Sequence, residues 1–461
     1  MITVSIMLSI GFMQVSAQNA SFGVRADANV VSQGNAAMSL SLRQCVQIAV
    51  EENINIKTTR IDAEKSQYKK AEAISAIIPK ISAGANFQDN LKLPTTMLPG
   101  EIIGQPGTSV PVQMGSTFNT SASVTLNWTF YNQTAITAVQ LAQKVNEISH
   151  LSIEKASEEL TAEVAKLYFL TVTTSQQKEL IEENITRTKH IQDITKLLVD
   201  NGMGKQVDYD RISITLENLY TQLNNVEAGL QQQHNMIKYM LNIPLKSTIV
   251  LTDNPTMELL QNLPEPTANF SEHIDIRLLE AQRETNIISK KMTNSGYVPT
   301  LSFTGQYAVQ GMRKEFANYF NNNPENQWFG TSYIGVGLSI PIFDGLEKRS
   351  KSQQAKMEIQ KTDALLLDTR ERFTANYQNA VTNYFNNKTN VERQQQNIEL
   401  AEKVYNETAL KYREGLATMS NLLQDEISLN SAQANYLTAL YNYKEAELKI
   451  MSLTGQIKSL I

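Results

Sequence analysis

The sequence has little of what builds disulfide-stapled domains, metal centres and enzyme active sites. Its 461 residues include one cysteine, Cys45, and four histidines without metal-ligand spacing. A single cysteine excludes an internal disulfide framework and a zinc knuckle. Phosphate-binding glycine loops and nucleophile-elbow motifs are also missing. We therefore predict a protein that is not an enzyme, with no catalytic, cofactor-binding or metal-binding residues and no cofactor.

The chain also lacks an excess of positive charge and, beyond its first residues, any long apolar run. The formal net charge is −5, which argues against nucleic acid as a partner. No stretch after residue 17 reaches the ~18 apolar residues that a membrane-spanning helix needs. The sequence therefore predicts no helical membrane anchor in the mature chain.

Residues 1–17 differ from the rest in being mostly apolar. Ile2 to Phe12 form the apolar stretch, and Val15-Ser16-Ala17 fits a small-residue cleavage site. This segment resembles a secretory signal peptide, although no Lys or Arg precedes its apolar stretch. An apolar first strand or helix is the alternative interpretation. We predict a signal peptide at 1–17, followed by an N-terminal linker at 18–38.

Glycine and proline are absent from two long stretches of similar length. One runs from Thr134 to Asn201 and the other from Leu346 to Glu414. An uninterrupted helix of either length would extend roughly 100 Å. Helices of ordinary globular domains are far shorter, so these stretches are typical of coiled coils or helical arrays.

Each long helix is predicted to turn at glycine and to return beside itself. The turns carry Gly202 and Gly204 in one case and Gly415 in the other, because glycine readily adopts the positive φ that ends a helix. The second long helix has a heptad seam through Ile398, Ala401, Tyr405, Thr408 and Tyr412. We expect its returning partner to pack through Leu423, Ile427, Ala434, Leu437 and Tyr441. The polar faces would either line a water-filled duct or form an ordinary solvated exterior.

The order of elements occurs twice, which indicates an internal duplication. The first repeat is predicted at 39–250, with a helix, a β-hairpin at 80–131 and a helical hairpin at 134–243. The second is predicted at 271–457, with a helix, a β-hairpin at 299–343 and a helical hairpin at 345–453. An inter-repeat linker at 251–270 and a C-terminal tail at 458–461 complete the division.

The strands of both β-hairpins alternate between apolar and polar residues. Between Phe118 and Phe130 the even positions are mostly apolar and the odd positions are polar, and a similar pattern extends from Ile334 to Ile342. Long loops at 89–117 and 311–327 join the paired strands. Such alternation is typical of outer-membrane barrels. An antiparallel sheet half-buried in a soluble domain has the same pattern.

Four strands are too few to close a transmembrane barrel. Lipid does not tolerate an open sheet edge, and the smallest such barrels have about 8 strands. The chain must therefore pool its strands with copies of itself. The polar face carries small residues such as Ser82, Ser121 and Thr304, which favour an open, wet lumen and the larger of the possible assemblies. The predicted fold class is mainly α with a small β part.

Several motifs together resemble the TolC-like outer-membrane efflux proteins. They are the Leu-x-x-Cys-Val-x-x-Ala opening from Leu42 to Ala49, the Phe343-Asp344-Gly345 strand exit, the two glycine turns and the duplicated layout. The resemblance covers about residues 39–457. It implies a homotrimer with a twelve-stranded barrel in outer-membrane lipid and a periplasmic α-barrel. It also implies a passive exit duct for efflux or secretion, served by a periplasmic adaptor and an inner-membrane RND or ABC-type transporter.

The resemblance also implies a periplasmic gate near the helix turns. By position, Asp208 and Tyr412 match an aspartate–tyrosine pair that holds the end of the tube closed. Asn421 and Gln424 stand where the best-known members carry two lumen-facing aspartates, and Ala417 replaces an arginine. A strong anionic ring is therefore not expected, and block by divalent cations should be weak.

The same resemblance implies that the adaptor docks on the turns. The docking tips are Gly202, Met203, Gly204, Gly415 and Leu416. Exposed apolar residues at a turn suit partner contact, whereas a plain turn is the competing interpretation. A non-channel periplasmic coiled-coil scaffold or an adaptor-like interaction protein is the alternative for the whole chain. It would account for the long helices but not for the four alternating strands.

Overall fold

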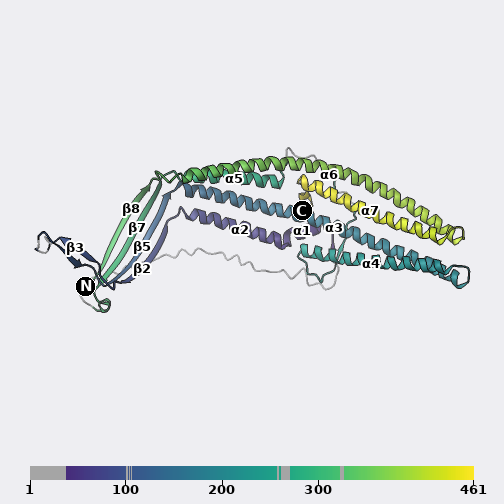
Figure 1. The fold of residues 1–461 in the computed structure, drawn as a ribbon, viewed down its shortest axis with the longest axis horizontal. Coiled ribbons are helices and arrows are strands. Elements are labelled where there is room, and N and C mark those ends of the chain that lie inside the picture. The colour runs from purple at the N-terminus through teal and green to yellow at the C-terminus, as the bar shows by residue number, and fades with distance from the viewer. Residues whose placement is uncertain are drawn as a thin grey trace.

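The polypeptide extends from a β-sheet at one end to two helical turns at the other, as Figure 1 shows. This computed structural model describes residues 38–99, 102, 104, 106–256, 259–260, 270–321 and 327–461. The predicted signal peptide and nearly all of the predicted linker at 18–38 lie outside the described residues. Four helices extend from the sheet, and two of them are the first arms of helical hairpins that reach the opposite end of the molecule.

Both repeats contain the same five elements. The first has α2 (Ile54–Ser75), β2 (Lys80–Asp89), β5 (Phe118–Tyr131), α3 (Gln133–Asp200) and α4 (Gln206–Met240). The second has α5 (Ile274–Ser295), β7 (Thr300–Arg313), β8 (Trp328–Ser339), α6 (Glu347–Arg413) and α7 (Met419–Leu453). Matching helices have 22 and 22, 68 and 67, and 35 and 35 residues. The duplication thus extends to the length of each helix.

The two long helices form without interruption, as the absence of glycine and proline predicted. Asn132 begins α3, since its side-chain oxygen accepts the backbone N–H of Ala135 at 3.2 Å. At the start of α6 the chain bends at Gly345 and Leu346, whose φ values are 67° and 68°. The Asp344 carboxylate then accepts the N–H of Lys348 at 3.0 Å. Side-chain hydrogen bonds therefore define the start of each long helix, directly after the preceding strand.

The four main strands form one antiparallel sheet in the order β2-β5-β7-β8. The β5–β7 pair joins the two repeats. Val124 lies opposite Tyr307, and Phe303 lies opposite Val336, so most apolar residues of the four strands share one face, although Phe329 and Tyr333 of β8 lie on the other. Serine, threonine, asparagine and glutamine dominate the other face. Strand β8 ends earlier than predicted, at Ser339, because Pro341 cannot donate to a ladder.

Both predicted loops between paired strands contain secondary structure. Residues 89–117 include β3 (Thr95–Pro99) and β4 (Ser109–Gln113), which pair antiparallel with each other and extend beyond the main sheet in Figure 1. In the second repeat, β7 continues to Arg313 and a short 3-10 helix, η3 (Phe316–Tyr319), follows. Neither segment was predicted, because a strand of five residues or a single helical turn leaves little periodicity to detect.

A second, smaller sheet and two short elements complete the middle of the molecule. Strands β1 (Met38–Leu40) and β6 (Ile249–Leu251) pair in parallel, so the predicted boundaries at residues 38 and 250 fall inside strands. Helix α1 (Leu42–Glu52) starts at a capping box formed by Ser41 and Gln44. The terminal helix η4 (Gln456–Leu460) overlaps the predicted tail and packs on α3 and α7.

The main hydrophobic core lies in this middle region, where α1, α3 and α7 meet. Cys45, Tyr168 and Ile450 are fully buried there. Burial raises the pKa of the Cys45 thiol to about 12, so this cysteine is a packing residue, as predicted. Lys444 and Glu447 are also completely buried and form an ion pair of 2.6 Å. The helical hairpins therefore project from a firmly packed centre.

Candidate functional site at the hairpin tips

The first hairpin turns through a Schellman motif centred on Gly202. Its φ is 70°, which suits glycine better than any other residue. The N–H of Gly202 donates to the Val199 carbonyl at 2.9 Å, and the N–H of Met203 donates to the Leu198 carbonyl at 2.8 Å. These bonds satisfy the last carbonyl groups of α3 and leave the Met203 side chain 74% exposed.

The second hairpin repeats this turn around Gly415, whose φ is 77°. The N–H of Gly415 donates to the Tyr412 carbonyl at 3.1 Å, and the N–H of Leu416 donates to the Lys411 carbonyl at 2.8 Å. Leu416 is also 74% exposed. The two turns thus present one apolar side chain each, at the same position of the same motif.

Among the predicted gate residues, Asp208 lies in the first turn of α4. Its carboxylate is 3.8 Å from Arg211. The guanidinium of Arg211 in turn donates to the Ser420 hydroxyl on α7 at 2.8 Å. Asp208 therefore belongs to a chain of polar contacts that links the first hairpin to the second.

Tyr412 links the hairpins at a second point. Its hydroxyl lies 3.4 Å from the Thr195 hydroxyl on α3. Within the described part of one chain, Tyr412 contacts Thr195 and Asp208 contacts Arg211, so these two gate residues do not bond to each other there. The predicted Asp208–Tyr412 pair remains a prediction.

The other two predicted gate residues lie on the surface of α7. Asn421 and Gln424 are both exposed, and the Asn421 backbone N–H donates to the capping hydroxyl of Thr418 at 3.3 Å. Counted from the tip glycines, Asn421 and Gln424 occupy the same positions as Asp208 and Arg211. The first repeat therefore carries an ion pair where the second carries two neutral amides.

A buried carboxylate that the sequence analysis missed lies further from the tips. Glu426 on α7 is 2% exposed, and its Oε2 atom is 3.4 Å from Nε of Arg187 on α3. The Arg187 guanidinium also lies over the Tyr405 ring of α6, 4.9 Å from its centroid. Three helices from both hairpins thus meet around one buried charge pair.

Burial and Arg187 act in opposite directions on the ionisation of Glu426. Burial is the largest influence and raises the pKa of the Glu426 carboxyl group, whereas Arg187 opposes that rise. The contacts to the carboxylate are not well-aligned hydrogen bonds, so they compensate poorly for lost water. Burial likewise raises the pKa of Tyr405, and the Glu426 charge adds to that rise. The cluster is therefore a polar contact between the hairpins in which the carboxylate is incompletely hydrogen-bonded.

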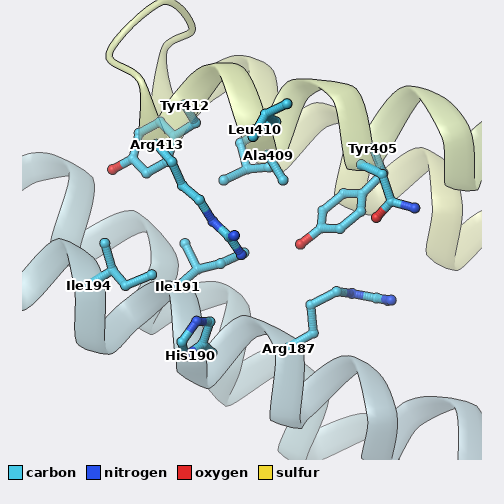
Figure 2. Close-up of a pocket in the computed structure, with 11 residues that line it drawn as sticks. Arg187, His190, Ile191, Ile194, Tyr405, Ala409, Leu410, Tyr412 and Arg413 are labelled. Atoms are coloured by element: carbon cyan, nitrogen blue, oxygen red, sulfur yellow. The ribbon is translucent and has the colours of Figure 1, made fainter.

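A cavity of about 370 Å³ opens beside the cluster, between α3 and α6. Figure 2 shows Arg187 and His190 on the α3 side, with Tyr405 and Arg413 reaching across from α6. The cavity lies beside a small hydrophobic cluster that joins the hairpins through buried side chains of both, among them Ile191, Ile212 and Leu422.

The positions of Tyr405 and Glu426 can be compared with the equivalent positions of the first repeat by counting from the tip glycines. Tyr405 and Glu426 of the second repeat correspond to Gln192 and Ser213 of the first. Gln192 donates to the Ser213 hydroxyl at 2.9 Å. Both repeats therefore keep a polar contact between the arms of the hairpin at this level, but only the second repeat makes it ionisable.

The sequence does not single out Glu426 because the apolar stripe predicted on α7 lies on the wrong face near the tip, although its residue Leu437 is buried. The buried residues near the tip are Met419, Leu422, Glu426 and Leu429, whereas the predicted stripe residue Ile427 is 54% exposed. The signal that could have revealed Glu426 is that it is the single carboxylate among the residues of this buried stripe. The seam predicted on α6 is better placed, since its central residue Tyr405 is 3% exposed.

Within the described part of the chain, no three His, Cys, Asp or Glu side chains are grouped so that they could hold a metal ion. Among the same residues, no helix combines the length and apolar character needed to cross a membrane.

Comparison with known proteins identifies the family. Residues 45–242 and 272–456 match the family described as outer membrane efflux protein. The outer membrane protein TolC of Escherichia coli K12 is 20% identical over 436 residues, which cover 90% of this chain and 82% of TolC. The alkaline protease secretion protein AprF of Pseudomonas aeruginosa is 23% identical over 312 residues, which cover 65% of this chain and 62% of AprF.

A solved structure agrees with these matches. The outer membrane protein VceC of Vibrio cholerae superposes with a TM-score of 0.70 at 13% sequence identity, and the match covers 90% of this chain and 96% of VceC. This similarity shows that the fold is shared over 90% of this chain, and the family match spans both repeats. The chain therefore belongs to the outer membrane efflux protein family, whose members are outer-membrane channel proteins with periplasmic helical domains rather than enzymes.

Proposed function

We propose that three copies of this chain form one passive exit duct for efflux or secretion. Each copy would contribute four strands to a twelve-stranded barrel in the outer membrane and four long helical arms to a periplasmic tube. The observation that carries this proposal is the four-stranded sheet, which is mostly apolar on one face, mostly polar on the other and, among the described residues, unpaired at both edges. Lipid outside and water inside would satisfy both faces.

The two free edges are complementary. Each neighbouring pair in the order β2-β5-β7-β8 is antiparallel, so β8 runs opposite to β2. The β8 edge of one copy can therefore pair antiparallel with the β2 edge of the next. A repeated head-to-tail contact of this kind closes into a ring when the rotation per copy allows it. Closure would satisfy the edge N–H and C=O groups that lipid cannot.

Cross-linking across this edge tests the proposal. Ala83 on β2 and Ser332 on β8 lie in the same row across the sheet. In a Cys45→Ala background, an Ala83→Cys, Ser332→Cys double variant in membranes should react with a flexible bismaleimide to give covalent dimers and trimers and nothing larger. Either single-cysteine variant serves as the matched control and should stay monomeric. Only monomer from the double variant, or a ladder beyond the trimer, would contradict a closed ring of three.

We further propose that the hairpin ends form a closable periplasmic gate. Asp208, Tyr412, Asn421 and Gln424 lie at this end of the chain. The contacts of Arg187 with Glu426 and of Arg211 with Ser420 join the two hairpins. Opening would separate the hairpins and break such contacts, while the packed centre of the molecule stays intact.

A periplasmic adaptor and an inner-membrane transporter of the RND or ABC class would complete the pathway. Support for the adaptor comes from the tips, where Met203 and Leu416 expose most of their apolar surface in two equivalent turns. Such residues gain from burial against a partner. The secretion role in the name of AprF supports a duct that serves export.

A further inference from the structure

Aromatic side chains gather at the end of the main sheet that lies farthest from the helices. The segment that follows β7 folds back over the apolar face of the sheet, and we name residues Phe316–Phe320 the aromatic segment. Phe316 packs on Phe87 of β2 and Phe118 of β5, with ring centroids 5.9 and 5.8 Å apart. Tyr319 lies 6.4 Å from Trp328 of β8. The segment therefore touches residues of three strands.

Tyr319 fixes the segment to the sheet. Its hydroxyl accepts from the Thr120 hydroxyl at 2.7 Å and donates to the Gly311 carbonyl at 3.4 Å. Thr120 and Gly311 are opposite each other, and Phe87 and Trp328 extend the same row to the outer strands. A Cβ atom at Gly311 would lie 3.2 Å from the Trp328 ring. Glycine thus leaves room for the Trp328 ring on the neighbouring strand.

A buried arginine lies beneath the aromatic residues. Arg313 is 3% exposed, and its guanidinium lies 5.3 Å from the Tyr319 ring centroid and 5.9 Å from that of Trp328. One guanidinium nitrogen donates to the carbonyls of Met312 and Gln327 at 2.9 and 3.0 Å. Aromatic faces and backbone carbonyls therefore enclose a charge that would be costly against acyl chains.

The outer surface of the segment remains apolar and uncovered within the described chain. Phe316 is 52% and Phe320 is 79% exposed. Burying a phenylalanine side chain contributes about 1.5–3 kcal/mol, so water is an unfavourable environment for both rings. The surface is continuous with the apolar face of the sheet. A partner that covers that face would cover the rings as well.

The position of the segment along the strands matches a membrane boundary. Phe118 and Trp128 lie on the same face of β5, ten residues apart, which is about 34 Å along a strand. At a barrel tilt of about 40°, this separation gives a height of about 26 Å, close to the ~25 Å apolar band of outer-membrane barrels. The aromatic segment packs on Phe118 and would therefore lie at the outer boundary of that band.

We propose that the aromatic segment is a membrane-interface anchor, with Phe316 and Phe320 inserted between the head groups and acyl chains of the outer leaflet. The inference rests on the proposed barrel, whose apolar face must already lie against lipid. It goes further in assigning a lipid-contacting role to a connection outside the strands. Aromatic rings favour this interfacial layer, and the Tyr319 and Arg313 contacts hold the segment in place for it.

Fluorescence quenching in lipid tests the anchor. In the Cys45→Ala background, Phe320→Cys is labelled with an environment-sensitive fluorophore, and the assembled protein is placed in vesicles containing acyl-brominated phospholipid. Ala317→Cys is a second labelling position that keeps every aromatic ring of the segment. The matched control is Met312→Cys, because Met312 pairs with Asn119 on the polar face at the same end of the sheet. We expect loss of emission at 317 and 320 and no loss at 312.

A further label separates failure of the anchor from failure of the barrel. Val124 lies at the middle of the apolar face and is 50% exposed, so Val124→Cys reports lipid contact of the sheet itself. Lipid quenching at 124 without lipid quenching at 317 and 320 overturns the anchor alone. Aqueous iodide then distinguishes labels at 317 and 320 that face water from labels that a neighbouring copy shields, and either result contradicts the anchor. Absence of lipid quenching at all three positions overturns the barrel.

Discussion

The guanidinium of Arg187 on α3 lies 3.4 Å from the carboxylate of Glu426 on α7, and this contact joins the two helical hairpins of one chain. Glu426 is almost completely buried, while Arg187 is 29% exposed. Arg187 also lines the cavity between α3 and α6. Because the contact crosses between hairpins, its strength bears directly on how readily the hairpins separate.

Glu426 should make the junction more stable in mild acid. Burial raises its folded-state pKa above the ordinary 4.5. Its contribution to stability is therefore fully present below about pH 4.5 and is lost as the pH rises through the folded-state pKa. Glu426→Gln keeps the shape and removes the titration. We expect its thermal stability to change less than that of the wild type from about pH 5 to about pH 8 and to exceed it at the alkaline end.

Thermal melts of the purified assembly across this range would check the Glu426 prediction. Glu445→Gln is a suitable control, because Glu445 lies on the same helix and is 44% exposed, paired with Lys166. An identical pH slope for the wild type and Glu426→Gln would contradict the assignment.

Loss of Arg187 should loosen α3 from α7. Arg187→Met leaves the Glu426 carboxylate buried without its cation. We expect the local free energy of opening to fall by about 2 kcal/mol, less than the roughly 3–5 kcal/mol of a fully buried pair, because Arg187 keeps some solvent contact. Hydrogen exchange of the α3 and α7 backbone measures this change. An Arg187→Met, Glu426→Gln double variant should recover most of the loss, and protection unchanged in the single variant would refute the coupling.

Removal of the exposed tip side chains should weaken adaptor binding without destabilising the duct. A Met203→Ser, Leu416→Ser double variant deletes two side chains that would each contribute about 1.5–3 kcal/mol on burial. We expect affinity for the cognate adaptor to fall by about a hundredfold, with thermal stability unchanged. Ile214→Ser is the control, since Ile214 is 63% exposed on α4 but lies away from the turn. Equal losses for both variants would argue against docking at the tips.

Block of the channel by divalent cations should be weak. Asn421 and Gln424 are neutral and exposed on α7, so they supply no anionic ring. Closely spaced carboxylates attract a divalent cation. An Asn421→Asp, Gln424→Asp double variant should therefore be blocked at a divalent-cation concentration at least roughly tenfold lower than the concentration that blocks the wild type. Single-channel recording with added cations measures both. Potent block of the wild type at low concentration would show that other groups bind the cation.

The sequence predicted the long helices and their turns well because few residues decide them. Absence of glycine and proline over each long run leaves helix as the favoured state, and Gly202 and Gly415 mark the ends. The strand faces followed from strict alternation between Phe118 and Phe130, which fixes the face of every residue once one is known. The end of β8 at Ser339 could have been read from Pro341.

The tip contacts and the aromatic segment could not be predicted in the same way. Leu422 and Leu423 are adjacent leucines, so two neighbouring stripes of α7 are both apolar and periodicity alone does not choose between them. The choice comes from packing against α3 and α6, and it decides that Glu426 is buried. Tyr319 similarly depends on Thr120, which is distant in the sequence. Neither contact leaves a local pattern.

The stoichiometry and conductance of the purified protein test the central claim most directly. Protein extracted from outer membranes should have three protomer masses by light scattering in detergent and should form conducting pores in planar bilayers. A stable, detergent-independent single chain that never conducts would contradict the account, because one four-stranded sheet with two free edges cannot line a pore in lipid.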